Sequence, residues 1–245
     1  MIFTHTAADR RKKRPSESVR RVWRTGFSDG LRYNRRPERQ TGNNMPAPLI
    51  RLASGSPRRR EILENLGYRI ERLNADIDET PRPGEPPAAY VLRMAREKNA
   101  AALRLLRETG APPSESPVLS ADTAVALDGD ILGKPESPEH ARAMLRRLSG
   151  REHEVHTALC LFAHGLAHTA VQTSRVRFAP LSDAQIAAYV QSGEPLDKAG
   201  AYGIQGAGGV FVRELRGSFS GVMGLPVYET CELLRQAGCA VPPFG

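Results

Sequence analysis

Two charged residues stand where the sequence predicts a buried environment. Lys98 belongs to a helix predicted over residues 88–108, and Asp122 interrupts the apolar run 118–127, a strand of the kind that is buried on both faces. The helix residues three, four and seven positions from Lys98 are all apolar: Val91, Met94, Ala95, Ala101, Ala102 and Leu105. An unpaired charge is costly to bury, so each residue needs a partner of opposite charge. For Lys98 we expect a phosphate or a catalytic carboxylate, and the alternative is a structural salt bridge or a lysine that extends to solvent.

A third charged residue, Lys134, is predicted to join this pair. The dipeptide Asp128-Gly129 is a strong signal for a two-residue hairpin turn, and the turn sets the register of the return strand. In that register Thr123 faces Lys134, which places Lys134 beside Asp122 if the return strand persists that far. Two lysines around one aspartate indicate phosphate chemistry, and a structural ion-pair cluster is the alternative.

More charged groups precede these elements in the sequence. The strand predicted over 49–53 leads through Ser54-Gly55-Ser56-Pro57 into a capped helix over 57–66, a unit that points backbone N–H groups at an anion. Arginines in a first turn oppose the helix dipole, and a bound polyphosphate would explain Arg58 and Arg59, whereas we expect Arg60 to be solvated. The loop 76–80 contributes carboxylates, and carboxylates with Mg²⁺ or Mn²⁺ among cationic side chains are typical of phosphoryl transfer sites.

The segment 193–206 is rich in glycine, which permits close approach of the backbone to a ligand. A tight structural loop explains the same composition equally well, so this signal is weak. Gln205 has an amide that both donates and accepts, as recognition of a base edge requires.

These residues are positioned by alternating strands and helices. Further strands are predicted at 68–74, 131–132, 153–163, 168–179 and 210–215, and further helices at 138–148, 183–191 and 226–237. The order predicts an α/β fold with a mixed, twisted β-sheet flanked by helices. No linker interrupts residues 45–245, so we expect one compact domain there.

Charge and composition separate an N-terminal segment from this domain. Residues 1–44 contain 12 Lys/Arg against 4 Asp/Glu, which accounts for the whole net charge of +8 and leaves the body neutral. We predict that this basic extension is disordered; it is a candidate for nucleic-acid binding, which the neutral body is not. Three cysteines without a C-x-x-C pair, no apolar run of membrane-spanning length and no secretory signal predict a cytoplasmic protein.

Seven segments of the chain, taken in order, resemble the Maf family of nucleoside triphosphate pyrophosphatases, and they span residues 49 to about 237. They are LASGSPRRREIL (52–63), DIDET (76–80), REKNA (96–100), SADTAVALDGDILGKP (120–135), LSGREHEVHTAL (148–159), GEPLDKAGAYGIQG (193–206) and GLPVYET (224–230). The resemblance implies a Maf/ITPase-like fold, usually as a homodimer, and cleavage between the α- and β-phosphates in the house-cleaning of nucleotide pools. One departure is Phe219-Ser220-Gly221, where many relatives carry an asparagine.

The resemblance also implies residue roles. Asp122 would accept the proton of the attacking water and would hold a divalent cation (Mg²⁺, Mn²⁺ or Co²⁺) together with Glu79. Lys98 and Lys134 would neutralise the phosphates, and Ser54 and Arg59 would bind the triphosphate. An open alternative makes Glu79 the base and Asp122 only a metal ligand.

Three positions distinguish the subgroups of the family. The dTTP/UTP form carries Arg58, Thr123 and Gln205, as this chain does. Members that prefer 7-methyl-GTP typically have Trp after the proline and Gln after the aspartate. The resemblance therefore implies a pyrimidine nucleotide as the substrate. The alternatives are a pyrophosphatase for 7-methyl-GTP or other modified nucleotides, and a binding protein that regulates cell division.

Overall fold

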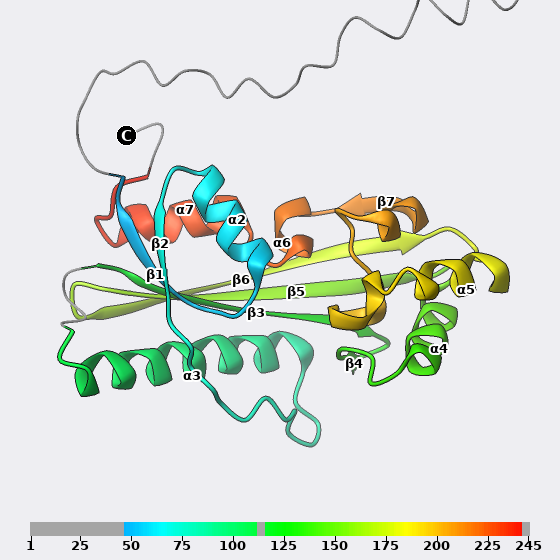
Figure 1. Ribbon diagram of the computed structural model, residues 1–245, viewed down its shortest axis with the longest axis horizontal. Helices are drawn as coiled ribbons and strands as arrows, with labels where there is room; N and C mark the ends of the chain where they lie inside the picture. Colours follow the sequence, from blue (N-terminus) through cyan, green and yellow to red (C-terminus); the bar gives the residue numbers. More distant parts are fainter. Residues whose placement is uncertain (1–46, 112–115, 242–245) are drawn as a thin grey trace, which may run out of the picture. The chain divides into compact units, whose positions relative to one another are not determined.

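A sheet of seven strands that combines parallel and antiparallel pairing forms the centre of the fold (Figure 1). The computed structural model describes residues 47–111 and 116–241, so the predicted basic extension 1–44 lies outside the described residues. The strand order is β2-β1-β3-β5-β6-β7, with β4 paired to β3. The bounds are β1 Leu49–Ala53, β2 Arg69–Arg72, β3 Val118–Leu127, β4 Asp130–Leu132, β5 Glu152–Ala163, β6 Leu166–Phe178 and β7 Val212–Arg216.

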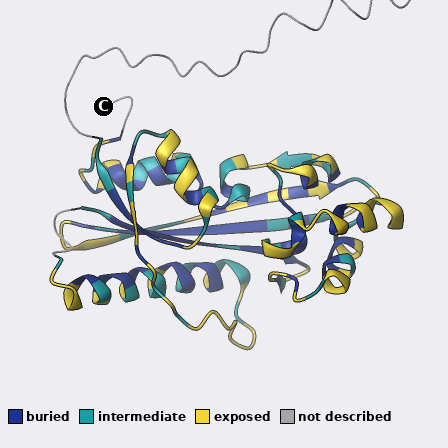
Figure 2. Ribbon diagram, viewed as in Figure 1, coloured by how far each residue is buried: buried dark blue, intermediate teal, exposed yellow. Residues whose placement is uncertain are grey.

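Helices cover both faces of this sheet, as predicted for an α/β fold. The long helix α3 (Pro87–Glu108) lies along one face, and α2 (Pro57–Asn65), α6 (Phe219–Met223) and α7 (Val227–Gln236) cover the other (Figure 1). The helices α4 (Pro138–Leu148) and α5 (Asp183–Gln191) pack together at one end. Figure 2 shows that the central strands are buried along most of their length, because helices pack on both of their faces.

The alternation of side chains along β3 assigns its residues to the two faces. Ser120 donates a hydrogen bond to the Ala95 carbonyl of α3, so the even-numbered residues, Asp122 among them, face α3. Leu119 and Ala121 pack with Leu63 of α2 in the core on the opposite face. Thr123 therefore lies on the α2 face, next to Asp122 in sequence but on the other side of the sheet.

The middle of β3 lacks a strand neighbour on one side within the described chain. β1 pairs in parallel with residues 118–120 only, and β4 pairs with residues 125–127 only. On its other side β3 pairs with β5 from Val118 to Ala126 without interruption. Residues 121–124, which include Asp122 and Thr123, therefore face an opening between the end of β1 and the end of β4.

The structure confirms most predicted elements and corrects three. The predicted strand 68–74 is limited to β2, and the predicted strand 210–215 begins as the 3₁₀ helix η3 (Ala207–Phe211) before β7. The short helix α6, which falls on the Phe219-Ser220-Gly221 departure, was not predicted. Its five residues are too few for a periodic pattern, and its N-cap is Ser218, whose hydroxyl accepts from the Gly221 amide. Among the described helices none combines the length and the apolar character needed to cross a bilayer.

Candidate active site

A cavity of about 710 Å³ lies over the opening beside β3, and the β3 residues at that opening form the floor of the cavity. All nine residues that the sequence analysis singled out line it, and they come from five separate parts of the chain. They are Ser54, Arg58, Arg59, Glu79, Lys98, Asp122, Thr123, Lys134 and Gln205. The fold thus brings the predicted site residues together in one place.

Asp122 and Lys98 form a direct ion pair on the α3 side of the cavity. The Nζ of Lys98 lies 2.6 Å from Oδ1 of Asp122 and 2.9 Å from Oε1 of Glu79, so one ammonium joins two carboxylates. Burial raises the pKa of the Asp122 carboxyl, against the opposing effects of Lys98 and Arg59. The Asp122 side chain is 10% exposed and that of Glu79 is 58% exposed, which makes Asp122 the more sheltered carboxylate.

The position of Lys98 differs in one respect from the prediction. The lysine is at the margin of the buried face of α3 and not at its centre, and its side chain is 12% exposed toward the cavity. The centre is occupied by Asn99, whose amide donates to the carbonyls of Val118 and Cys160. This buried amide fixes α3 against β3 and β5, and so places Lys98 at the opening.

The helix α3 also holds the loop that carries Glu79. The hydroxyl of Tyr90 donates to the Glu79 carbonyl at 2.9 Å, and Arg93 donates to the Thr80 carbonyl at 3.1 Å. Arg93 is itself fixed by a 2.6 Å ion pair with Glu85. These contacts keep the Glu79 carboxylate within reach of Lys98 although its side chain is largely exposed.

Arg59 is the buried cation on the opposite side of the cavity floor. Its guanidinium donates to the Gly224 carbonyl at 2.7 Å, to Ser54 Oγ at 2.8 Å and to Thr123 Oγ1 at 3.1 Å. All three acceptors are neutral, and no carboxylate within the described residues forms an ion pair with it, although the residue is only 8% exposed. Burial disfavours the charged form of the guanidinium and lowers the pKa of Arg59. An anion in the cavity would therefore stabilise the positive charge of this residue.

The start of α2 has the predicted residues at the capping positions, although the Ser56 side chain makes no capping hydrogen bond. Ser56 is the N-cap residue and Pro57 the first helical residue, and the helix opens into the cavity. Arg58 lies 3.5 Å from Asp197, and Arg60 is exposed and paired with Glu64, which is the solvated position predicted for it. Only Arg58 and Arg59 of the three arginines line the cavity.

Lys134 lines the same cavity but does not reach Asp122 as predicted. The predicted register is correct, since Leu127 pairs with Asp130 and Val125 with Leu132, but β4 ends at Leu132. Lys134 is exposed and has no ion pair with a described carboxylate. Its ammonium therefore belongs to the opening of the cavity, where it is available to an incoming anion.

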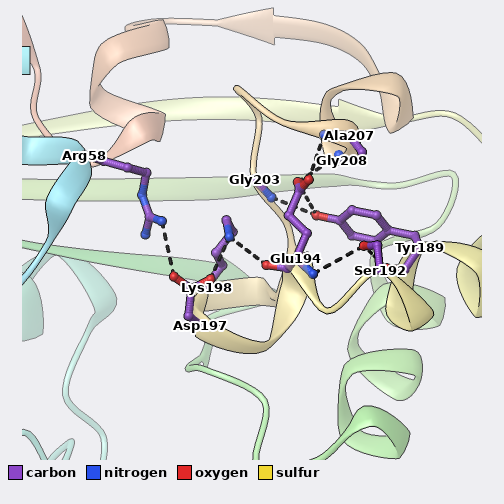
Figure 3. Close-up of polar contacts among 9 residues, drawn as sticks. All are labelled: Arg58, Tyr189, Ser192, Glu194, Asp197, Lys198, Gly203, Ala207 and Gly208. Atoms are coloured by element: carbon purple, nitrogen blue, oxygen red, sulfur yellow. Dashed lines mark hydrogen bonds and ion pairs between the residues drawn. The ribbon is translucent and has the colours of Figure 1, made fainter. Parts of the chain in front are cut away.

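The glycines of the segment 193–209 surround a carboxylate of the protein itself. Figure 3 shows that Glu194 accepts hydrogen bonds from the Tyr189 hydroxyl and from the amides of Ala207 and Gly208. A Cβ at Gly206 would lie 2.4 Å from the Glu194 carboxylate, and one at Gly208 would lie 2.6 Å from the Tyr189 hydroxyl. The structural explanation of the glycine pattern is therefore correct for this part of the segment. Its exposed residue Gln205 still lines the cavity.

The lining of the cavity combines two kinds of chemistry. Cationic side chains, among them Arg58, Arg59, Lys98 and Lys134, line it together with the start of α2. Neutral and apolar groups line it as well, including Val125, Ile204, Val222, Met223 and Gln205. A ligand that carries both a polyanionic portion and a less polar portion suits this lining.

Comparison with known proteins identifies the family of the chain and several relatives. A family model described as Maf-like protein matches residues 49–237. A dTTP/UTP pyrophosphatase of Neisseria gonorrhoeae is 56% identical over 191 residues, which are 78% of this chain and 95% of that protein. A protein of the same name from Chromobacterium violaceum is 54% identical, over 79% of this chain and 96% of that protein.

Among solved structures, the Staphylococcus aureus Ham1 protein is 17% identical and has a TM-score of 0.38, covering 55% of this chain and 72% of its own. That likeness is too slight to support the fold, which is established by the strand order of the chain itself. The family match extends from β1 to α7 and thus includes every residue of the cavity floor. The chain belongs to the Maf-like protein family.

Proposed function

We propose that this chain hydrolyses dTTP and UTP to the nucleoside monophosphate and pyrophosphate. The observation that carries the proposal is the buried Arg59, a cation without a carboxylate partner within the described residues, across the cavity floor from the Asp122–Lys98 pair. A polyphosphate supplies the missing anion, and the carboxylate supplies a base. The names of the Neisseria and Chromobacterium relatives support this reaction and these substrates.

The reaction is an in-line displacement at the α-phosphorus. Water attacks that phosphorus, its proton passes to Asp122, and the bond to the bridging oxygen breaks so that pyrophosphate leaves. Burial raises the pKa of the Asp122 carboxyl, which favours this carboxylate as the proton acceptor. Lys98 and Lys134 stabilise the charge that develops on the phosphate oxygens, and Arg59 binds and orients the polyphosphate.

The donor groups fit a divalent cation such as Mg²⁺, Mn²⁺ or Co²⁺. Oxygens of Asp122 and Glu79 already converge on one positive charge, the Lys98 ammonium. Mg²⁺ is commonly held by one or two protein carboxylates and completes its shell with phosphate oxygens and water, and Asp122 and Glu79 are the carboxylates that would hold it here. Such an ion, when bound, would polarise the phosphates and activate the water.

The preference for pyrimidines is assigned to Arg58, Thr123 and Gln205. All three line the cavity, and they come from α2, from β3 and from the Gly-rich segment. Ser54 accepts a hydrogen bond from Arg59, and we assign it, together with Arg59, to the binding of the triphosphate. We further propose that the protein acts in the cytoplasm as a homodimer that removes unwanted nucleotides. The opposing hypothesis is a binding protein that regulates cell division or engages nucleic acid through residues 1–44, and these residues lie outside the described part.

The test is the release of pyrophosphate from a panel of nucleotides with each of the three metal ions. We expect dTTP and UTP to be the best substrates and Asp122→Asn to lower kcat by about 10²- to 10⁴-fold. Orthophosphate as the sole product, or no turnover of any nucleotide, would contradict the proposal. A preference for 7-methyl-GTP would preserve the reaction and overturn the assigned substrate.

A further inference from the structure

Thr157 is a polar residue of the sheet to which the mechanism above gives no role. It lies on β5 directly opposite Thr123 of β3 and is completely buried. Its hydroxyl donates to the Gly221 carbonyl of α6 at 2.8 Å and lies 2.9 Å from Thr123 Oγ1. A hydroxyl in this position links the active-site strand to a helix that sequence analysis did not predict.

Counting protons fixes the direction of the whole chain of hydrogen bonds. A hydroxyl has one hydrogen, and a carbonyl only accepts, so the Thr157 hydroxyl donates its hydrogen to the Gly221 carbonyl. Thr123 must then donate to Thr157, and its own oxygen is left to accept from Nη2 of Arg59 at 3.1 Å. The order of donation is therefore Arg59 to Thr123, Thr123 to Thr157, and Thr157 to the Gly221 carbonyl.

The same short helix holds Arg59 by a second route. The Gly224 carbonyl, at the C-cap of α6, accepts from Nε of Arg59 at 2.7 Å. Arg59 is thus joined to this helix twice: through Thr123 and Thr157 to the Gly221 carbonyl, and directly to the Gly224 carbonyl at the C-cap. A third N–H of Arg59 donates to Ser54. A guanidinium has five N–H groups, so two remain to bind phosphate oxygens. Their direction is determined by the three that are fixed.

We propose that Thr157 is a positioning residue that, through Thr123, orients the Arg59 guanidinium toward the polyphosphate of the substrate. The inference rests on the proposed function, since it concerns the same cavity. Thr157→Val leaves the Gly221 carbonyl without its donor and lets the Thr123 hydrogen turn toward Arg59, where two donors would oppose each other. The guanidinium would then leave its position, and every substrate that shares the triphosphate would be affected alike.

The experiment compares Thr157→Val and Thr157→Ser with the matched control Thr230→Val. Thr230 of α7 is also completely buried, and its hydroxyl donates to the carbonyl of Pro226, the N-cap residue of the same helix. It is not part of the series of hydrogen bonds that leads to Arg59. We expect Thr157→Val to raise KM for both dTTP and UTP about tenfold, with kcat changed less than about threefold, since a charge-assisted contact contributes roughly this factor. Thr157→Ser, which keeps the hydroxyl, should remain within about threefold of wild type.

A second readout separates this inference from the proposed reaction. Binding of inorganic pyrophosphate, measured by calorimetry in the presence of Mg²⁺, needs no turnover and should weaken about tenfold in Thr157→Val only. If Thr157→Val and Thr230→Val bind pyrophosphate equally well, or if only the ratio of dTTP to UTP turnover changes, the positioning role is wrong. If wild type binds pyrophosphate but cleaves no nucleotide, the proposed function fails while the role of Thr157 is still measured. Absence of pyrophosphate binding in wild type, with nucleotides still cleaved, overturns the positioning role and leaves the proposed function intact.

Discussion

The carboxylate of Glu194 organises the Gly-rich wall of the cavity, and Glu194→Gln tests how much depends on it. The two carboxylate oxygens accept three hydrogen bonds, at 2.9 Å from the Tyr189 hydroxyl, 2.9 Å from the Ala207 amide and 3.2 Å from the Gly208 amide. A glutamine has one oxygen and one NH₂ group in the same space. If its oxygen keeps Tyr189 and Gly208, its NH₂ group meets the Ala207 N–H, and two donors face each other.

The magnitude follows from the lost acceptor. One hydrogen bond to a charged group contributes about 1.5–3 kcal/mol, so we expect the free energy of unfolding to fall by about 2–3 kcal/mol. For a domain of this size the melting temperature should fall by roughly 5–10 °C. The glycines leave no room for the side chain to withdraw, since Gly206 approaches the carboxylate more closely than a Cβ would permit.

The assay is thermal unfolding followed by circular dichroism, with Glu61→Gln as the control. Glu61 is exposed on α2 and has no side-chain partner within the described residues, so this change should shift the melting temperature by less than about 1 °C. Burial opposes ionisation of Glu194, but the Ala207, Gly208 and Tyr189 hydrogen bonds outweigh it and lower its pKa. The stabilisation is therefore complete above the ordinary pKa of 4.5 and is lost as the pH falls through the lowered value. A melting temperature of Glu194→Gln within 1 °C of wild type at pH 7 would refute the reasoning.

Three further predictions concern single residues. Gly200→Ala should cost about 2–4 kcal/mol in urea unfolding, because Gly200 has φ 68° and its Cβ would lie 2.8 Å from Val125; a loss below 1 kcal/mol would contradict this. Lys134→Ala should lower kcat/KM for dTTP by about tenfold or more while the melting temperature stays unchanged, since this exposed lysine has no ion pair within the described residues; equal activity would remove it from the site. Burial lowers the pKa of His153 to about 4, so below its ordinary value of 6.5 the unfolded chain binds a proton that the folded chain does not. Stability should therefore fall by about 2 kcal/mol between pH 7.5 and pH 5, and urea titrations of His153→Gln should show a smaller fall.

Local signals in the sequence were sufficient for much of the fold. The dipeptide Asp128-Gly129 predicted both the turn and the register of β3 with β4, because a two-residue loop leaves the chain little freedom. Asp122 and Lys98 were recognised because a charge within an apolar pattern requires a partner, and that partner proved to be the other residue of the pair. Lys134, Arg58, Arg59 and Gln205 were singled out by local signals as well. The resemblance added Ser54, Glu79 and Thr123, and all of these residues line one cavity.

What the sequence did not reveal depends on pairing between distant segments. Thr157 looks like an ordinary strand residue until β5 is placed in register with β3, and only then does it meet Thr123. The same holds for Glu194, whose partners lie 13 and 14 residues later in a segment without regular periodicity. Lys134 shows the limit of extrapolating a register, since the hairpin ended two residues before the predicted contact.

The two outermost strands of the sheet bear on how the protein avoids aggregation. An outer strand exposes unpaired N–H and C=O groups to which a strand of another molecule can add. Here β2 has only four residues, Arg-Ile-Glu-Arg, and β7 has five, Val-Arg-Glu-Leu-Arg. Arginine and glutamate at both edges make the approach of an identical edge unfavourable, because like charges must be desolvated together. A sheet that is left open at both sides thus retains a barrier against growing into a larger one.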